Sequence, residues 1–119
     1  MANACFCVLL AAFAAVQYND PDIYLWIPVY LIPAYLSGRA AFRPADLTTP
    51  ALLTLLVVAL VAAVAAVVWT WPASEGFWRR DIWWESEAVR ESMGLMIVVA
   101  AMVVVAISVW GHRRRYLAR

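Results

Sequence analysis

Lysine is absent from the sequence, histidine occurs once and cysteine occurs twice. The one histidine, His112, stands at the opposite end of the last apolar segment from the acidic residues, which excludes a Ser-His-Asp triad or a histidine-rich metal site among them. Cys5 and Cys7 are two residues apart, so on a helix they point to different faces and cannot form a disulfide with each other. No glycine-rich phosphate loop and no basic stripe with interleaved aromatic residues occurs. We therefore expect no nucleic-acid partner, and the residues supply no catalytic set and identify no cofactor.

Charge is scarce as well, since 14% of the residues are charged, against about 25% in an average soluble domain. Hydrophobic residues make up 66% of the sequence, and the mean hydropathy is +0.79. A soluble chain of this size leaves about a third of its unfolded surface in water, so it could not hide so much apolar surface. Lipid as the surrounding solvent removes the contradiction. The composition predicts a membrane protein whose first partner is the lipid bilayer.

Four apolar runs are long enough to cross a hydrocarbon core of about 30 Å as helices. They cover residues 2–18, 23–42, 50–71 and 92–110. The first is the shortest and could be read as a signal peptide cleaved after Ala14, but no basic residue precedes it, which favours a retained helix. We predict an all-α, polytopic membrane protein in which residues 1–119 form one compact bundle of four transmembrane helices.

The arginines indicate the orientation of this bundle, because cytoplasmic loops carry an excess of basic residues. The second connection contains Arg39 and Arg43, and the C-terminal tail contains four further arginines. The first connection has no basic residue, and in the third the acidic residues outnumber the basic ones. Both termini are therefore predicted to be cytoplasmic. The arginine-only basic set and the abundance of alanine and valine indicate a GC-rich genome and a bacterial inner membrane.

The connections contain recognisable turn residues. Asp20 suits a helix N-cap and Pro21 the first helical position, and Thr49 with Pro50 repeats this arrangement before the third run. Inside the second run, prolines 28 and 33 each remove a backbone hydrogen bond and favour a kink. The third connection is rich in tryptophan, so we expect a short helix lying in the outer membrane interface between the third and fourth spans.

Two polar segments are predicted to meet at the outer side. The first lies at the turn between spans one and two, and the second at the start of span four. On a helix, positions 87, 90, 91 and 94 share one face. The small residues Ala101 and Ser108 continue this face, so we expect it to point into the bundle. A second row of small residues in span one, through Ala4, Ala11, Ala15 and Tyr18, could pack against it. The candidate cluster consists of Gln17, Tyr18, Asn19, Asp20, Asp22, Glu87, Arg90 and Glu91.

Three interpretations of this cluster remain open. Arg90 could pair with Asp20 or Asp22 and clamp the hairpin to the fourth helix. Alternatively, the carboxylate and amide oxygens could bind Ca²⁺, Mg²⁺ or Mn²⁺, since hard cations prefer oxygen ligands. A catalytic pair of carboxylates is the third interpretation.

The same segments carry a family resemblance. The run Gln17-Tyr18-Asn19-Asp20-Pro21-Asp22, followed by Trp26, Pro28 and Tyr30, resembles the signature of the transmembrane protein 220 family. The pattern Glu87-x-x-Arg90-Glu91-x-x-Gly94-Leu95 is similar to the later motif of that family. The resemblance covers essentially the whole chain, with Ile23 standing where the family often has proline. It implies a small four-helix membrane protein in which the two polar segments are the distinguishing feature, and it implies no particular activity.

The predicted function follows from the absence of polar residues at the positions expected near the bilayer midplane. Transporters bind their substrates near the bilayer midplane at broken helices, whereas here only the second run is broken and the midplane residues are apolar. We therefore expect an accessory or scaffolding protein that binds other membrane components, either other subunits or a second copy. The alternative is a membrane protein that binds or transports an ion or small molecule through the outer acidic cluster.

Overall fold

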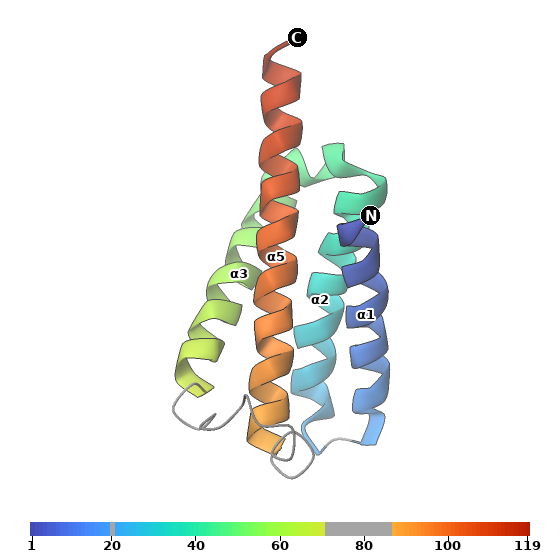
Figure 1. Ribbon diagram of the computed structural model, residues 1–119, viewed down its shortest axis with the longest axis vertical. Coiled ribbons are helices and arrows are strands. Elements are labelled where there is room, and N and C mark those ends of the chain that lie inside the picture. Colours follow the sequence, from blue (N-terminus) through green and yellow to red (C-terminus); the bar gives the residue numbers. More distant parts are fainter. Residues whose placement is uncertain (20, 71–86) are drawn as a thin grey trace.

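The computed structural model describes residues 1–19, 21–70 and 87–119, which form an all-α structure. No strand occurs among these residues, so the all-α part of the predicted fold class is confirmed. The predicted tryptophan-rich interfacial helix lies almost wholly outside the described residues. The elements in chain order are α1 (Ala2–Val16), η1 (Gln17–Asn19), α2 (Ile23–Phe42), η2 (Pro44–Thr48), α3 (Pro50–Thr70) and α5 (Glu87–Leu117) (Figure 1).

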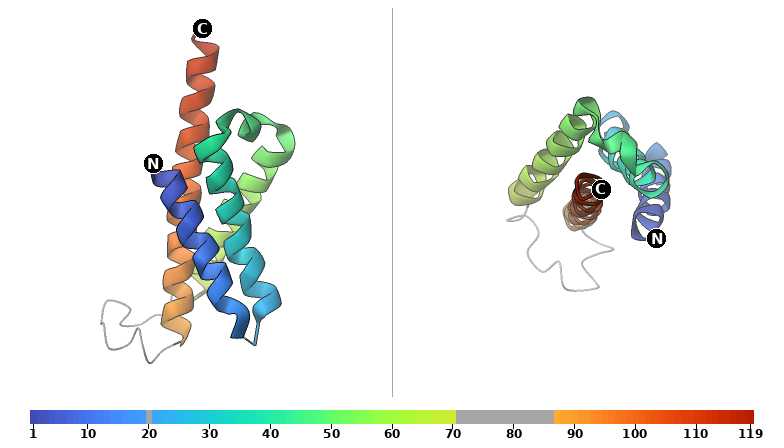
Figure 2. Two further views of the ribbon diagram at one scale, coloured as in Figure 1. Left: turned by 90° about the vertical axis from the view of Figure 1, so that its right-hand side faces the viewer. Right: turned by 90° about the horizontal axis from the view of Figure 1, so that it is seen from above.

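The helices run up and down along the longest axis of a molecule measuring 53 × 26 × 23 Å. Helices α1 and α2 form an antiparallel pair, α3 leans away from that pair, and α5 lies between the two (Figures 1 and 2). We call the end that carries η1 and the start of α5 the hairpin end, and the opposite end the η2 end. The last turns of α5 extend beyond the other helices at the η2 end (Figure 1).

The sequence patterns predicted most of the helix bounds. Helix α2 covers the predicted 23–42, and α3 begins at Pro50, whose fixed φ angle suits the first helical position. The capping residue of α2 was assigned wrongly, because Asp22, and not Asp20, is the N-cap residue. The Asp22 carbonyl accepts the first hydrogen bonds, from the amides of Leu25 and Trp26 at 2.9 and 3.1 Å. Helix α5 is longer than predicted at both ends, since it spans Glu87–Leu117.

Two of the helices are long and apolar enough to cross a membrane, namely α3 and the segment Val89–Leu117 of α5. Helix α1 is apolar but has only 15 residues, a length of about 22 Å. Helix α2 has 20 residues, but prolines, tyrosines and Arg39 lower its mean hydropathy. By length and composition, two of the four predicted spans are thus supported as candidate membrane spans.

The core forms where α5 meets the other three helices. Helix α5 buries one stripe that includes Leu95, Val98, Ala101, Met102, Val105 and Val109. The small-residue face predicted for this helix is confirmed at Gly94 and Ala101, which are buried. A β-carbon on Gly94 would collide with the Tyr30 hydroxyl of α2, so the two backbones approach closely only because Gly94 has no side chain.

The row of small residues predicted for the first span is wrong. Ala11 and Ala15 are exposed, whereas Asn3, Leu10 and Ala14 are the buried residues of α1. The physical reason is that α1 packs mainly against α2 and only partly against α5. Larger side chains on α1 therefore fill the space between the helices.

Candidate functional site

A pocket of about 350 Å³ lies at the hairpin end between α1, α2 and α5. Its lining residues are Phe13, Gln17, Tyr30, Arg90, Met93, Gly94 and Ile97. Each of the three helices contributes, because the α1–α2 turn and the start of α5 lie at the same end of the bundle (Figure 1). We call this cavity the hairpin-end pocket.

Aromatic rings fix one wall of the hairpin-end pocket. The rings of Phe13 and Tyr30 meet edge to face with centroids 5.5 Å apart. Behind them, Trp26 stacks on Tyr30 at 6.0 Å. Tyr30 and Trp26 are 5% and 8% exposed, and the tip of Tyr30 rests on Gly94. Aromatic pairs at these separations stabilise each other by about 0.5–1.5 kcal/mol beyond the area that they bury, so these contacts help to hold the wall in place.

The structure brings together only some of the predicted cluster. Gln17 and Arg90 line the same pocket, although they come from opposite ends of the sequence. Tyr18 is 72% exposed on η1, Asp22 is exposed at the start of α2, and Glu91 is half-buried on α5. The side chains of Asn19 and Glu87, and all of Asp20, lie outside the described part of the chain.

The face of α5 that points into the bundle is rotated from the predicted one. Val89 and Ser92 are 1% and 0% exposed, whereas Arg90 between them is exposed. The prediction that Arg90 points into the bundle is therefore wrong, and its side chain lines the mouth of a pocket. Among the described residues, no group of three or more His, Cys, Asp or Glu side chains is placed to hold a metal ion.

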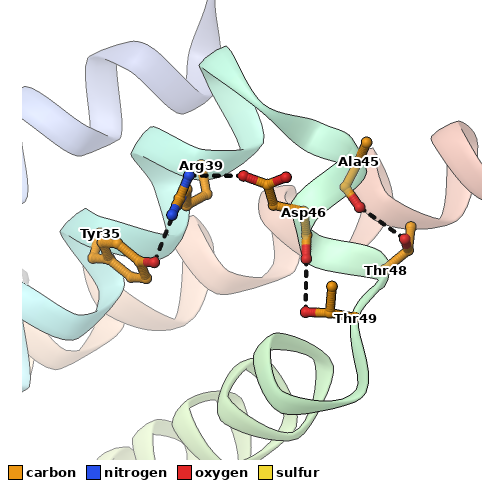
Figure 3. Close-up of polar contacts among 6 residues, drawn as sticks. All are labelled: Tyr35, Arg39, Ala45, Asp46, Thr48 and Thr49. Carbon is orange, nitrogen blue, oxygen red and sulfur yellow. Dashed lines mark hydrogen bonds and ion pairs between the residues drawn. The ribbon is translucent and has the colours of Figure 1, made fainter.

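A second polar cluster, which the sequence analysis missed, lies at the η2 end (Figure 3). Arg39 Nη1 forms an ion pair with Asp46 Oδ2 at 2.7 Å, and Arg39 Nε donates a hydrogen bond to the Tyr35 hydroxyl at 3.0 Å. The Thr49 hydroxyl donates to the Asp46 carbonyl at 2.8 Å. These contacts fix the turn between α2 and α3. In the sequence alone, Arg39 is informative only as a charge that indicates orientation.

Polar contacts also tie α5 to its neighbours inside the bundle. The Asn3 amide donates to the Ser108 hydroxyl at 2.8 Å, and that hydroxyl donates to the Val104 carbonyl at 2.9 Å. On the other side, the hydroxyls of Thr70 and Ser92 share a hydrogen bond of 3.2 Å. Asn3 was also missed, although a polar residue within an apolar helix usually faces other helices.

An apolar groove of about 330 Å³ separates α2 from α3. The α3 wall contains Ala59, Ala62, Ala63 and Ala66, and the α2 wall contains Tyr24, Pro28, Val29 and Pro33. Leu95 and Val98 of α5 also line the groove. We call this feature the α2–α3 groove.

A bundle of apolar helices, two of them long enough to span a membrane, with polar residues gathered at its ends, defines a small α-helical membrane protein. Residues 9–107 match the model of transmembrane family 220, helix. The chain belongs to this family, and the matched range contains both polar segments on which the resemblance was based. No solved structure matches the chain.

Proposed function

We propose that this protein is an accessory membrane protein whose α2–α3 groove receives a transmembrane helix of another membrane protein. In this proposal residues 1–119 form one domain that crosses a bacterial inner membrane four times, with both termini in the cytoplasm. The groove carries the proposal because its apolar walls include two helix positions at which proline removes a backbone donor.

The up-and-down arrangement supports the four spans. Helices α1, α2 and α5 lie side by side, and α3 runs along the same long axis at a tilt (Figures 1 and 2). If α3 and α5 cross the bilayer, the pair α1–α2 lies at the same depth and is surrounded by the same lipid. A short helix such as α1 is accommodated when the bilayer thins locally or flanking residues reach toward the interface.

The exposure of α3 supports a missing neighbour. Only 11% of the most apolar 18-residue stretch of α3 is buried, and α3 touches α2 at few points. Its groove wall contains four alanines beside Leu55 and Val58, and small residues allow another helix to approach closely. A transmembrane helix therefore fits this surface sterically.

Two prolines specify the chemistry of the partner. Pro28 and Pro33 lack the N–H groups that would bond to the carbonyls of Tyr24 and Val29, four residues earlier. All four residues line the groove. In a membrane, freed carbonyls are satisfied by neighbouring helices or their hydroxyl side chains, whereas acyl chains offer no donor. We therefore expect a partner helix that carries a serine, threonine or other donor at the contact.

Photo-crosslinking in native membranes tests this proposal. A benzophenone amino acid at Ala62, inside the groove, should give a discrete adduct whose mapped peptide lies in a membrane helix of another protein. The matched control is Val61, which is 63% exposed on α3 and does not line the groove. Filling the groove with Ala59→Leu should abolish the Ala62 adduct.

The other outcomes contradict the proposal in different ways. An adduct to a second copy of this chain would replace the partner by a homo-oligomer. Adducts to lipid alone, equal at Ala62 and Val61, would show that the groove is an ordinary lipid-facing surface.

A further inference from the structure

We propose that the hairpin-end pocket is a binding site for a single acidic amphiphile, a molecule with one carboxylate or phosphate group on an apolar chain. The head would bind at Arg90 and Gln17, and the chain would lie along Phe13, Met93 and Ile97. This site is separate from the α2–α3 groove, since the two cavities share no lining residue.

The pocket is polar at one end and apolar at the other. Arg90 and Ile97 both line it and are seven residues apart on α5, a separation of about 10 Å along the helix. On the antiparallel α1, Gln17 stands near the turn and Phe13 one turn deeper. Polarity therefore falls from the hairpin end toward the middle of the bundle, in the direction in which water gives way to hydrocarbon.

An amphiphile matches this gradient better than a hydrophilic solute or a hydrocarbon. A hydrophilic solute would leave its polar groups against Phe13, Met93 and Ile97 without hydrogen bonds, which costs free energy. A hydrocarbon would form no hydrogen bond or ion pair with Arg90 or Gln17. The volume of about 350 Å³ lies at the lower end of ligand pockets, which measure roughly 300–1,000 Å³, so one chain fits and a bulky molecule does not.

The charge of the lining selects an acid. Arg90 is the one charged side chain among the described residues that line the pocket. Its planar guanidinium has five N–H donors, so it can hold a protein partner and a ligand head at the same time. Guanidinium groups pair bidentately with carboxylates and phosphates, and the Gln17 amide can donate a further hydrogen bond. The carboxylate of Glu91 also lies on α5, but it does not line the pocket.

The packed aromatic wall makes the pocket a preformed site. Tyr30 is held between Phe13 and Trp26 and rests on Gly94. Side chains that are already ordered lose little further conformational freedom when a ligand binds. In the sequence pattern Arg90-x-x-x-Gly94, Arg90 thus binds the head group, and Gly94, one turn deeper, leaves the space for the aromatic wall.

Native mass spectrometry of the purified full chain in detergent tests the site with two acidic probes and one neutral probe. The acidic probes are oleate, with a carboxylate head, and oleoyl lysophosphatidylglycerol, a one-chain lipid with a phosphodiester head; the neutral probe is oleyl alcohol. We expect one bound molecule of an acidic probe per chain and weaker retention of oleyl alcohol. The acidic probe that binds more tightly identifies the source, either a free fatty acid or a one-chain phospholipid.

Three variants show whether the binding occurs in this pocket. Arg90→Gln should weaken acidic binding by about tenfold or more, as the loss of a charge-assisted hydrogen bond implies, and should bring it near the level of oleyl alcohol. Ile97→Trp should fill the apolar end and weaken both acidic probes while Arg90 is intact. Arg113→Gln is the matched control, because this exposed arginine lies at the η2 end, and it should leave binding unchanged.

Several results would overturn the inference. One is equal retention of oleyl alcohol and oleate, and another is unchanged acidic binding in Arg90→Gln. A third is a loss of acidic binding in Arg113→Gln equal to that in Arg90→Gln, which would indicate general attraction to a basic protein. Because Arg90 is exposed, its variant is expected to remain folded, and a melting curve checks this. Failure of the crosslinking at Ala62 would leave these outcomes unaffected, so the two proposals are tested separately.

Discussion

The hydroxyl of Tyr30 on α2 lies against Gly94 on α5, in the space that a β-carbon would occupy at position 94. The two residues come from distant parts of the chain and set the spacing of their helices at the hairpin end. Because Tyr30 is also the central ring of the aromatic wall, this single contact links helix packing to the shape of the pocket.

Gly94→Ala should destabilise the bundle by about 1–3 kcal/mol, the usual cost of forcing extra atoms into a packed core. The measurement is thermal unfolding in detergent. Tyr30→Phe in the same chain should restore part of the loss, since it removes the colliding oxygen. The relief is only partial because ring carbon Cζ would still lie 3.2 Å from the new methyl group. Equal melting temperatures of Gly94→Ala and the wild type would contradict this packing.

The hydrogen bond from Asn3 to Ser108 predicts an asymmetry between two single variants. Ser108→Ala removes the acceptor of the Asn3 amide, whose Oδ1 is already buried without a hydrogen-bond partner. Asn3→Ala leaves Ser108 with its bond to the Val104 carbonyl. Since an unsatisfied buried polar group costs more than the loss of a bond, Ser108→Ala should be the more destabilising change.

A double-mutant cycle measures the strength of this contact. Hydrogen bonds between membrane helices average about 0.6 kcal/mol in such cycles, and a similar coupling is expected between Asn3 and Ser108. Asn3→Ala combined with Ser108→Ala should then cost less than the sum of the single variants. Strict additivity would show that the two side chains do not interact in the folded protein.

The ion pair of Arg39 and Asp46 should contribute little to stability. Its side chains are 33% and 40% exposed, and ion pairs in contact with water contribute about 0–1 kcal/mol. Asp46→Asn is expected to lower the melting temperature slightly at low salt and to have no effect at high salt, because salt screens exposed charges. Thr48 provides a control in the same turn, since its hydroxyl bonds only to the neutral Ala45 carbonyl in the described contacts. Thr48→Ala should therefore show no salt dependence.

The sequence predicted the helices and most of their bounds because the relevant features are local. The end of α2 before Pro44 and the start of α3 at Pro50 follow from the fixed geometry of proline. The meeting of the first and last polar segments followed from an up-and-down topology, and Gln17 and Arg90 do line one pocket.

Rotation of a helix about its axis is much harder to predict in this chain. Helix α1 is apolar on nearly every side, so its sequence contains no polar face that would distinguish core from lipid. Its alanines suggested one contact face, whereas Leu10 and Ala14 form another. The Arg39–Asp46 pair escaped prediction for a related reason, because charge counts indicate orientation and contain no information on pairing.

Cysteine labelling tests the proposed four-span topology. In a background with Cys5→Ala and Cys7→Ala, Tyr18→Cys and Ala45→Cys place single thiols at exposed positions of opposite ends of the bundle. A membrane-impermeant maleimide added to intact cells should label position 18, at the hairpin end, and should label position 45 only after the membrane is opened. Ala118→Cys, near the C-terminus, should behave like position 45, because four crossings place η2 and both chain ends on the cytoplasmic side. Labelling of positions 18 and 45 from the same side would show that α2 does not cross the bilayer, and two spans, α3 and α5, would then remain.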